Sequence, residues 1–370
     1  MTLNRQKHVR YWRMCANILP DAYQSSDASR MFLGFFIVAA LDLLDVFDNP
    51  QLEKPVIAVQ ERKDWIDWIY SCQVPDGQGF RGFTGTDLRD RRSSHNKQWD
   101  PGNLPNTFFA LAALLTLNDD LSRVQRKELL SWLPRLQRPD GSFGEILGPD
   151  DEIEGGRDLR YCCCAAGIAY ILQDPATEPY QSPFDENRLI DYILSCQTYA
   201  GGFAESPLRE PHSGLSYCAI ATLQLLTRLD GTSSRRARET LDNQESCMRW
   251  LLERQTTVLY EERPESDEAD SDDEEPANND GSSTVNSFAD SPMYYTPPLL
   301  TVGFNGRDNK IADTCYCFWN SGALAILGSL HLADLQAVRR YLLDKVQHII
   351  GGFAKGPESP PGHSIRLSGY

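Results

Sequence analysis

One phrase recurs five times along this 370-residue chain: a Gln at the end of an apolar segment, followed some residues later by Gly and Phe. The five copies end at Phe80, Phe143, Phe203, Phe304 and Phe353. Another helix-like apolar segment follows each of the first four copies. The steps between these Phe residues are 63, 60, 101 and 49 residues. A period of about 50 to 60 residues with two helices in each unit predicts an array of helical repeats.

The local signals agree with helices and contain little that favours strands. Residues 32–47 are apolar on almost every side, which predicts a buried helix. In the repeated phrase, we expect Gly to end a helix in the left-handed conformation and Phe to fold back onto the core. We find no sustained alternation of apolar and polar residues. The predicted fold class is therefore all-α, built from helix pairs in one domain over residues 1–370.

The long fourth step contains an acidic segment. Residues 261–292 hold twelve acidic residues and one basic residue, so they carry −11 of the net charge of −16. Their composition cannot bury enough apolar surface to order the segment, so we predict a disordered insert within the domain. Its Asp272-Asp273-Glu274-Glu275 run is similar to a terpene synthase metal site. We reject that reading because carboxylates that hold Mg²⁺ and diphosphate must lie on a rigid helix face.

Composition also excludes some classes of protein. No stretch reaches the roughly 20 apolar residues that a membrane span requires. Residues 1–10 are polar and basic with no apolar run after them, which excludes a secretory signal, so we expect a cytoplasmic location. The remaining 338 residues carry only −5, and nothing indicates the basic face that nucleic-acid binding requires.

The segment from Arg307 to Tyr316 carries the most chemical information. Asp313 and Cys315 are two residues apart, and on a helix body they would point about 200° apart. They can converge on one ion only where a helix starts, and the apolar run after Tyr316 supports such a start. A carboxylate with a thiolate suits Zn²⁺. On this pattern alone, Asp313 as the N-cap before a buried cysteine is the alternative.

Two cations lie just upstream of this helix start. Arg307 and Lys310 near a helix N-terminus can form an anion site, and diphosphate is a natural occupant. On this pattern alone, a solvated surface pair is the alternative.

At this point the sequence resembles a known family. The segment Asp313-Thr314-Cys315-Tyr316-Cys317-Phe318-Trp319 resembles the zinc motif of protein prenyltransferase β-subunits, and the five repeats resemble the turns of their α/α toroid. The similarity extends over residues 7–355. Several stretches resemble β-subunits of the geranylgeranyl type I kind: Ile18-Leu19-Pro20, Phe35-Phe36 through Leu41-Asp42-Leu43-Leu44-Asp45, Trp68-Ile69-Tyr70 and Asp119-Asp120-Leu121-Ser122-Arg123-Val124.

The resemblance implies a role for each matching residue. The zinc ligands match Asp313 and Cys315, and the diphosphate contacts match His212, Arg307, Lys310 and Tyr316. The isoprenoid and peptide contacts match Arg160, Cys218 and Trp319, with Phe32 and Phe36 beside them. Lys355 matches the lysine of family members that need no Mg²⁺, because an ammonium there can neutralise the leaving diphosphate. Lys355 and Tyr316 are therefore the expected catalytic residues, zinc is the expected cofactor, and Mg²⁺ is not required.

Two departures from the family pattern affect these expectations. Phe32 stands where type I subunits have a small residue, and a bulky ring there could shorten the isoprenoid tunnel. The third zinc ligand of the family is a His that opens another helix about a dozen residues after the last Gly-Gly-Phe. Here His363 lies about two residues early, and the chain stops at Tyr370. The predicted toroid therefore lacks its last helices, with His363 as the candidate third ligand.

The expected function follows from the resemblance. The chain would be the β-subunit of a heterodimer with a prenyltransferase α-subunit. It would transfer a geranylgeranyl group from geranylgeranyl diphosphate to the cysteine of C-terminal CaaX proteins, such as small GTPases, with zinc. The alternatives are a farnesyltransferase β-subunit, or a truncated, zinc-free toroid that only binds the α-subunit.

Overall fold

The computed structural model describes residues 1–18, 26, 28–47, 56–173, 181–229, 231, 233–260 and 300–362, with only the backbone for the last two. The expected acidic insert, residues 261–292, lies outside these residues. The α-helices are α1 (Arg5–Asn17), α2 (Arg30–Leu43), α3 (Val59–Ser71), α4 (Leu104–Thr116), α5 (Arg126–Trp132), α6 (Leu159–Leu172), α7 (Glu186–Ser195), α8 (Ser213–Arg228), α9 (Ser234–Asp242), α10 (Glu245–Leu252), α11 (Thr314–Ile326) and α12 (Leu335–Arg340). The strands are β1 (Ile146–Leu147), β2 (Ile153–Glu154), β3 (Gln255–Thr256), β4 (Gly303–Phe304), β5 (Phe353–Ala354) and β6 (Pro361–Gly362), paired as β1–β2, β3–β4 and β5–β6.

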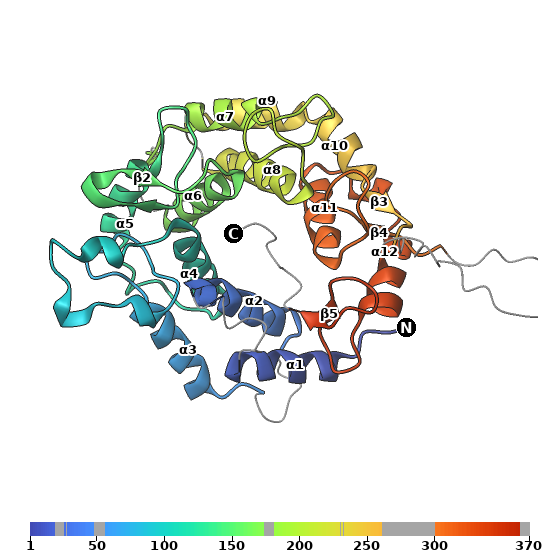
Figure 1. The fold of residues 1–370 in the computed structure, drawn as a ribbon, viewed down its shortest axis with the longest axis horizontal. Coiled ribbons are helices and arrows are strands. Elements are labelled where there is room, and N and C mark those ends of the chain that lie inside the picture. Colours follow the sequence, from blue (N-terminus) through green and yellow to red (C-terminus); the bar gives the residue numbers. More distant parts are fainter. Residues whose placement is uncertain are drawn as a thin grey trace, which may run out of the picture.

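The helices form two concentric rings. Figure 1 shows α2, α4, α6, α8 and α11 around the centre, with α1, α3, α5, α7, α9, α10 and α12 outside them. Each inner helix packs against the next one along the chain, from α2 through α4, α6 and α8 to α11. This arrangement confirms the predicted α/α toroid of helix pairs.

The composition of each helix explains the ring in which it lies. Inner helix α6 buries ten of its 14 residues, because it packs against both neighbours and against the outer ring. Outer helix α3 buries only two of its 13 residues and has a polar face toward solvent. The predicted buried helix over residues 32–47 is α2, but it ends at Leu43. Asp45 then takes a φ of 54°, which a continuing right-handed helix does not allow.

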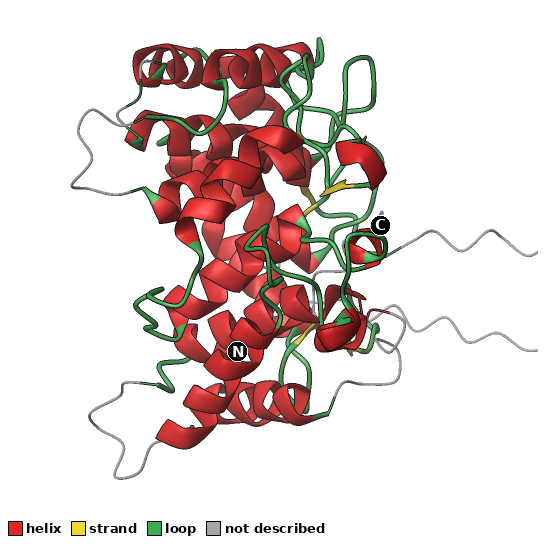
Figure 2. Ribbon diagram, turned by 90° about the vertical axis from the view of Figure 1, so that its left-hand side faces the viewer, coloured by secondary structure: helices red, strands yellow, loops and turns green. Residues whose placement is uncertain are grey.

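The five repeated phrases fold alike and form the joints of the toroid. In each joint the Gln pairs with the Phe through an antiparallel backbone bridge: Gln73–Phe80, Gln137–Phe143, Gln197–Phe203, Gln255–Phe304 and Gln347–Phe353. The first four of these Phe rings are fully buried. The joints gather at one end of the ring, on the right in Figure 2.

The glycine of the repeated phrase does not lie at the end of a helix, where the sequence predicted it. The helix before Gly201 ends at Cys196, which is right-handed, and Gly201 itself lies in the turn that follows, with a φ of 103°. A Cβ on Gly201 would lie 2.3 Å from the carbonyl oxygen of Ser246, in the first turn of α10. The expectation that this glycine ends a helix was therefore wrong. It allows the turn to lie against the next outer helix.

The side chain of each repeated Gln ties its joint to the start of that next outer helix. Gln137 accepts a hydrogen bond from the backbone N–H of Asp185, the N-cap of α7, at 2.9 Å, and donates one to the carbonyl of Asp185 at 2.9 Å. Three other joints repeat the bond from a backbone N–H to the Gln oxygen, at α5, α12 and α1, where the donors are Gln125, Asp334 and Asn4. At α10 the Gln197 side chain instead donates to the side-chain oxygen of Gln244 at 2.9 Å.

The link to α1 closes the ring (Figure 1). The buried ring of His8 accepts a hydrogen bond from the backbone N–H of Gly352 at its Nδ1 atom, at 3.1 Å. Its Nε2 atom lies 3.0 Å from Oε1 of Gln347, to which it donates. The first outer helix therefore packs on the fifth joint, which holds the two ends of the described chain together.

A second link fixes where the inner helices begin. At α2, α4, α8 and α11, an N–H group at the helix start donates to a carbonyl two residues after the Phe of the next joint. The pairs are Met31 to Gly82, Leu104 to Glu145, Ser213 to Gly306 and Thr314 to Lys355, at 2.8 to 2.9 Å. The N-termini of the inner helices therefore gather at the joint end of the ring.

The fifth joint differs from the others. In the described part of the chain no helix follows it, and the Phe353 ring is only partly buried. Its last residues still pair in the usual way, because Ala354 faces Pro361 as Ala204 faces Pro211 in the third joint.

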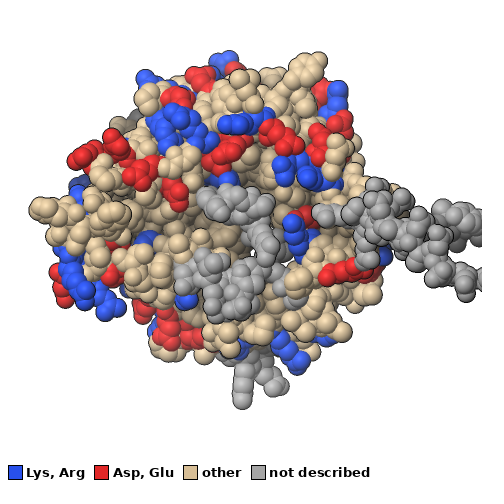
Figure 3. All heavy atoms as spheres, in the orientation of Figure 1, with Lys and Arg blue, Asp and Glu red and all other residues tan. Residues whose placement is uncertain are grey.

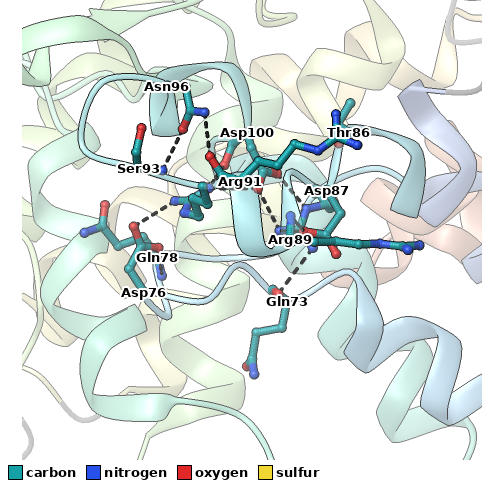
Figure 4. A network of polar contacts seen from close by, with 12 residues as sticks. Gln73, Asp76, Gln78, Thr86, Asp87, Arg89, Arg91, Ser93, Asn96 and Asp100 are labelled. Atoms are coloured by element: carbon teal, nitrogen blue, oxygen red, sulfur yellow. Dashed lines mark hydrogen bonds and ion pairs between the residues drawn. The ribbon is translucent and has the colours of Figure 1, made fainter.

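The longest described connection, between α3 and α4, is held by a buried ionic network (Figure 4). Asp100 is fully buried and accepts hydrogen bonds from Arg81 at 2.7 and 3.0 Å and from Arg92 at 2.8 Å. Arg92 also pairs with Asp76 at 2.9 Å. Because the network is buried, removing any one of its charges would leave another without a partner. The connection between α3 and α4 is therefore held in one conformation.

Candidate active site

A cavity of about 410 Å³ opens at the joint end, where α6, α8 and α11 begin. Its lining residues are Asp158, Arg160, Glu205, Arg209, Glu210, His212, Gly214, Leu215, Cys218, Arg307, Cys315, Tyr316 and Trp319. Seven of the residues singled out from the sequence therefore share one cavity: Arg160, His212, Cys218, Arg307, Cys315, Tyr316 and Trp319.

Three helix starts point their N–H groups toward this region. Asp158, His212 and Asp313 are the N-caps of α6, α8 and α11. Each side chain accepts a hydrogen bond from the backbone N–H two residues on, at 2.7, 3.0 and 2.9 Å, respectively. The positive ends of three helices of 13 to 16 residues thus converge beside two of the cavity's arginines, Arg160 and Arg307. Such an arrangement favours an anion.

His212 is a neutral hydrogen-bond donor in this site. Its Nδ1 accepts from the Gly214 N–H, so the proton is on Nε2, which lies 3.1 Å from the Tyr316 hydroxyl. Burial, together with the charges of Arg307 and Arg160, lowers the pKa of His212 to about 4. The imidazole is therefore uncharged near neutral pH, and it orients the Tyr316 hydroxyl.

The cavity's cations have unequal partners. The Arg160 guanidinium donates hydrogen bonds of 2.6 to 3.0 Å to the carboxylate of Asp158, which is buried. Arg307 donates to the Glu210 carboxylate at 3.1 Å, and both of these side chains are largely exposed. In the end-on view of Figure 3, basic and acidic side chains are interspersed over the surface. The selection of an anion therefore depends on the cavity itself.

Asp313 and Cys315 lie at the helix start that the sequence predicted, with Asp313 as the N-cap of α11. Asp313 has extended backbone angles before the first turn of α11, and its carboxylate accepts from the Cys315 N–H at 2.9 Å. Burial raises the pKa of Asp313, and burial together with the nearby Asp313 carboxylate raises the pKa of Cys315. Two acidic groups are therefore held together at a cost that a bound cation would relieve, and a carboxylate with a thiol is a donor set suited to Zn²⁺.

These two groups do not complete a metal site by themselves. Among the described residues, no group of three or more His, Cys, Asp or Glu side chains could hold a metal ion. His363, the predicted third ligand, lies outside the described residues. The Lys355 ammonium lies 3.9 Å from the Asp313 carboxylate, and the Lys355 side chain is 61% exposed. Lys355 is thus placed at the same helix start.

Aromatic rings pack on the inner helices beside the cavity, and of those named here Trp319 lines it. Trp319 packs against Tyr217 and Phe318, with ring centroids 5.0 and 5.1 Å apart. On α2, Phe32 and Phe36 pack edge to face at 4.6 Å. These two phenylalanines do not line the 410 Å³ cavity.

Lys310 also stands apart from the cavity. Its side chain is exposed and is not among the lining residues, whereas its carbonyl accepts a hydrogen bond from the Asn305 side chain at 2.9 Å. The sequence prediction had placed it beside Arg307.

The sequence analysis did not single out four charged residues that line the cavity: Asp158, Glu205, Arg209 and Glu210. Asp158 gave a usable signal, because an Asp directly before an apolar helix is a typical N-cap. Glu210 gave a weaker one, two residues before His212. Its pairing with Arg307, 97 residues away, has no local signature.

None of the helices in the described residues combines the length and the apolar character that crossing a membrane requires.

Comparison with known proteins agrees with the fold. A geranylgeranyl transferase type-1 subunit beta of Arabidopsis thaliana is 31% identical, covering 99% of this chain and 83% of that protein. The Dictyostelium discoideum protein of the same name is 30% identical, covering 97% and 87%, respectively. The solved structure of Candida albicans protein geranylgeranyltransferase-I complexed with GGPP superimposes with a TM-score of 0.73 at 27% identity, covering 98% of this chain and 89% of that one.

These similarities confirm the resemblance to type I β-subunits that the sequence predicted. Residues 3–365 match the family described as the prenyltransferase alpha-alpha toroid domain. The chain therefore belongs to the prenyltransferase alpha-alpha toroid family.

Proposed function

We propose that this chain is the β-subunit of a protein geranylgeranyltransferase that transfers a geranylgeranyl group to the cysteine of CaaX proteins. One observation carries the proposal: His212, Arg307 and Tyr316 line a cavity at three helix N-termini, directly beside the Asp313–Cys315 pair. An anion site and a thiol-binding site are thus neighbours. The similarity to type-1 β-subunits over nearly the whole chain supports the same assignment.

The diphosphate of geranylgeranyl diphosphate would occupy the cavity. Arg307 supplies a fixed positive charge, and the Tyr316 hydroxyl, oriented by neutral His212, supplies a hydrogen bond. The C–O bond to the diphosphate breaks as the cysteine sulfur attacks C1, so negative charge grows on the leaving oxygens. Preorganised donors at that position lower the barrier.

Zinc would be held by Asp313, Cys315 and His363. When bound, it would lower the pKa of the substrate cysteine and keep it as a thiolate. The described backbone reaches Gly362 paired with Phe353. The next residue of that strand, Ala354, accepts a hydrogen bond from the Thr314 hydroxyl of α11 at 2.6 Å. Pro361 pairs with Ala354, so the backbone passes the start of α11 two residues before His363, and this proximity supports His363 as the third ligand.

The Lys355 ammonium would supply the positive charge that a divalent cation would otherwise provide. Its carbonyl binds the first N–H of α11 and its ammonium lies near Asp313, so the side chain is anchored at the edge of the site. An ammonium there can neutralise the departing diphosphate. We therefore propose that transfer requires zinc but not Mg²⁺.

The remaining parts of the proposal concern partners. The protein substrates would be CaaX-tailed proteins, such as small GTPases, and the chain would act in a heterodimer with a prenyltransferase α-subunit in the cytoplasm. The Arabidopsis thaliana and Dictyostelium discoideum relatives are named as subunits, which supports a partner chain.

A specific observation keeps farnesyl transfer as a second candidate. Phe32, Phe36 and Phe109 form an aromatic cluster on the facing inner helices α2 and α4, with ring centroids 4.6 to 5.8 Å apart. Bulky rings at this position would leave less length for an isoprenoid and would favour C15 over C20.

The test is direct. The full chain would be co-expressed with a prenyltransferase α-subunit from its own source, and transfer from labelled geranylgeranyl and farnesyl diphosphates to CaaX peptides would be measured. We expect faster transfer from the C20 donor to peptides that end in Leu. Faster transfer from the C15 donor would favour the second candidate, and no transfer from either donor would overturn both.

A further inference from the structure

The contact between Arg307 and Glu210 crosses the mouth of the cavity. Arg307 Nη1 donates to Glu210 Oε2 at 3.1 Å, and the two residues come from different joints, 97 residues apart. The Arg307 side chain is 43% exposed and that of Glu210 is 57% exposed. Glu210 lies two residues before His212, on the connection between the third joint and α8. An exposed pair of this kind is weak and can exchange partners.

The second ion pair of the cavity has a different character. Asp158 is 3% exposed and holds Arg160, two residues away, through three side-chain contacts of 2.6 to 3.0 Å. Removing such a buried carboxylate would leave a charge without its partner, which is costly. Arg160 is therefore fixed, whereas Arg307 is held by a carboxylate that a ligand can replace.

Glu210 and a diphosphate would compete for the same guanidinium. Both are oxyanions, and both line or occupy the same cavity. A bound diphosphate must either displace the Glu210 carboxylate from Arg307 or lie close to this second negative charge. Either outcome raises the free energy of the complex.

We propose that Glu210 is a resident counter-anion of Arg307 that the diphosphate displaces, so that Glu210 weakens diphosphate binding and speeds the release of inorganic diphosphate. The inference rests on the proposed function and deepens it. Without ligand, Glu210 holds the Arg307 guanidinium and neutralises its charge. This weakens the binding of small anions, which have no apolar tail to add binding energy.

The test uses Glu210→Gln, which keeps the shape and removes the charge. We expect the Kd for geranylgeranyl diphosphate and the Ki of inorganic diphosphate both to fall about 3- to 10-fold, the range set by an exposed ion pair plus one nearby like charge. The gain should shrink as salt is raised, because the groups are exposed. A conservative Glu210→Asp variant, which restores the carboxylate, should lie close to the wild type.

Glu205→Gln is the matched control. Glu205 lines the same cavity, is exposed and carries the same charge, but the structure gives its carboxylate no cationic partner among the described residues. Its substitution should change the two constants by less than about twofold, since only a more distant charge is removed. Equal gains in Glu205→Gln and Glu210→Gln would mean that net charge alone acts, and this would overturn the proposal.

A double-mutant cycle tests the route through Arg307. In an Arg307→Gln background, Glu210→Gln should no longer improve the affinity for inorganic diphosphate, because no guanidinium remains to be released. A gain that persists in this background would also overturn the inference. Both side chains are largely exposed, so thermal melting should show that each variant folds.

The outcomes separate this inference from the proposed function. If the wild-type heterodimer binds neither geranylgeranyl diphosphate nor inorganic diphosphate, the proposed function itself fails. If the wild type binds both and Glu210→Gln leaves both constants unchanged, the function stands and the role of Glu210 fails.

Discussion

The side-chain oxygen of Gln347 accepts a hydrogen bond from the backbone N–H of Asn4, 343 positions earlier in the chain, at 3.0 Å. Asn4 is the N-cap of α1, so the last repeated Gln holds the first helix in the way that Gln137 holds α7. The ring is thus closed by the same contact that joins its successive units.

Gln347→Ala should loosen α1. The substitution removes the contacts to Asn4 and His8, and we expect a loss of about 1 to 2 kcal/mol in the free energy of unfolding. Hydrogen exchange in α1 should rise more than elsewhere. Gln137→Ala is the matched control, since it removes the equivalent link at α7 and should leave α1 protected. Unchanged exchange in α1 for Gln347→Ala would contradict the closing role.

Cys315→Ala should abolish prenyl transfer while diphosphate binding survives, because the thiol belongs to the proposed zinc set and the anion site is made by other side chains. Replacing zinc with Co²⁺ provides a second readout, in which the thiolate-to-cobalt absorption should disappear. Cys317→Ala is the control, because Cys317 is buried on another side of α11. Normal turnover by Cys315→Ala would rule out the zinc assignment.

Transfer by the wild-type heterodimer should persist in buffer free of Mg²⁺ while zinc is retained. Lys355→Asp should lower the rate by about 10² to 10³ and make the residual rate rise with added Mg²⁺, because a carboxylate can recruit the cation that the ammonium replaced. Lys355→Ala should be slow without responding to Mg²⁺. A wild type that already depends on millimolar Mg²⁺ would show that Lys355 has another role.

His212 should make folding stability depend on pH. The pKa of His212 is about 4 in the folded chain and about 6.5 when unfolded, so between pH 6.5 and pH 4 mainly the unfolded state gains the proton. Its stabilising contribution is complete above pH 6.5 and is lost as the pH falls to 4, by an amount on the order of 3 kcal/mol. His212→Gln should lack this part of the slope in urea titrations. If the free energy of unfolding of the two proteins changed with pH in the same way, this role of His212 would be refuted.

Deleting residues 262–290 should leave thermal stability and activity within about twofold. The strands that flank this region are paired, with Gln255 opposite Phe304 and Thr256 opposite Gly303, so the connection leaves and returns at one place. Loop length itself changes stability only weakly. A loss of folding, or of binding to the α-subunit, would show that the segment has a structural part.

The sequence predicted the toroid because the Gln, Gly and Phe pattern repeats five times and each copy carries the same information. It also placed Asp313 and Cys315 at a helix start, since a spacing of two allows convergence nowhere else on a helix. Both inferences depend on residues close together in the chain.

What the sequence could not show depends on distant partners. The contacts of the repeated Gln side chains join residues about 50 to 343 positions apart, and the repeated phrase does not indicate which residue each Gln contacts. In the same way, no spacing indicates that Arg307 pairs with Glu210, or that the Lys310 side chain lies outside the cavity. The glycine was misplaced because turn geometry depends on the neighbouring helix as well as on the turn residues.

The contact of Gln347 with Asn4 has one more consequence. A ring whose closing contact matches its internal ones has no structurally privileged first helix, so the chain's order of synthesis and its architecture are independent. A circular permutant that begins at residue 300 and ends at residue 260, with a flexible linker between the present termini, would keep every joint described here. We expect it to fold to the same toroid.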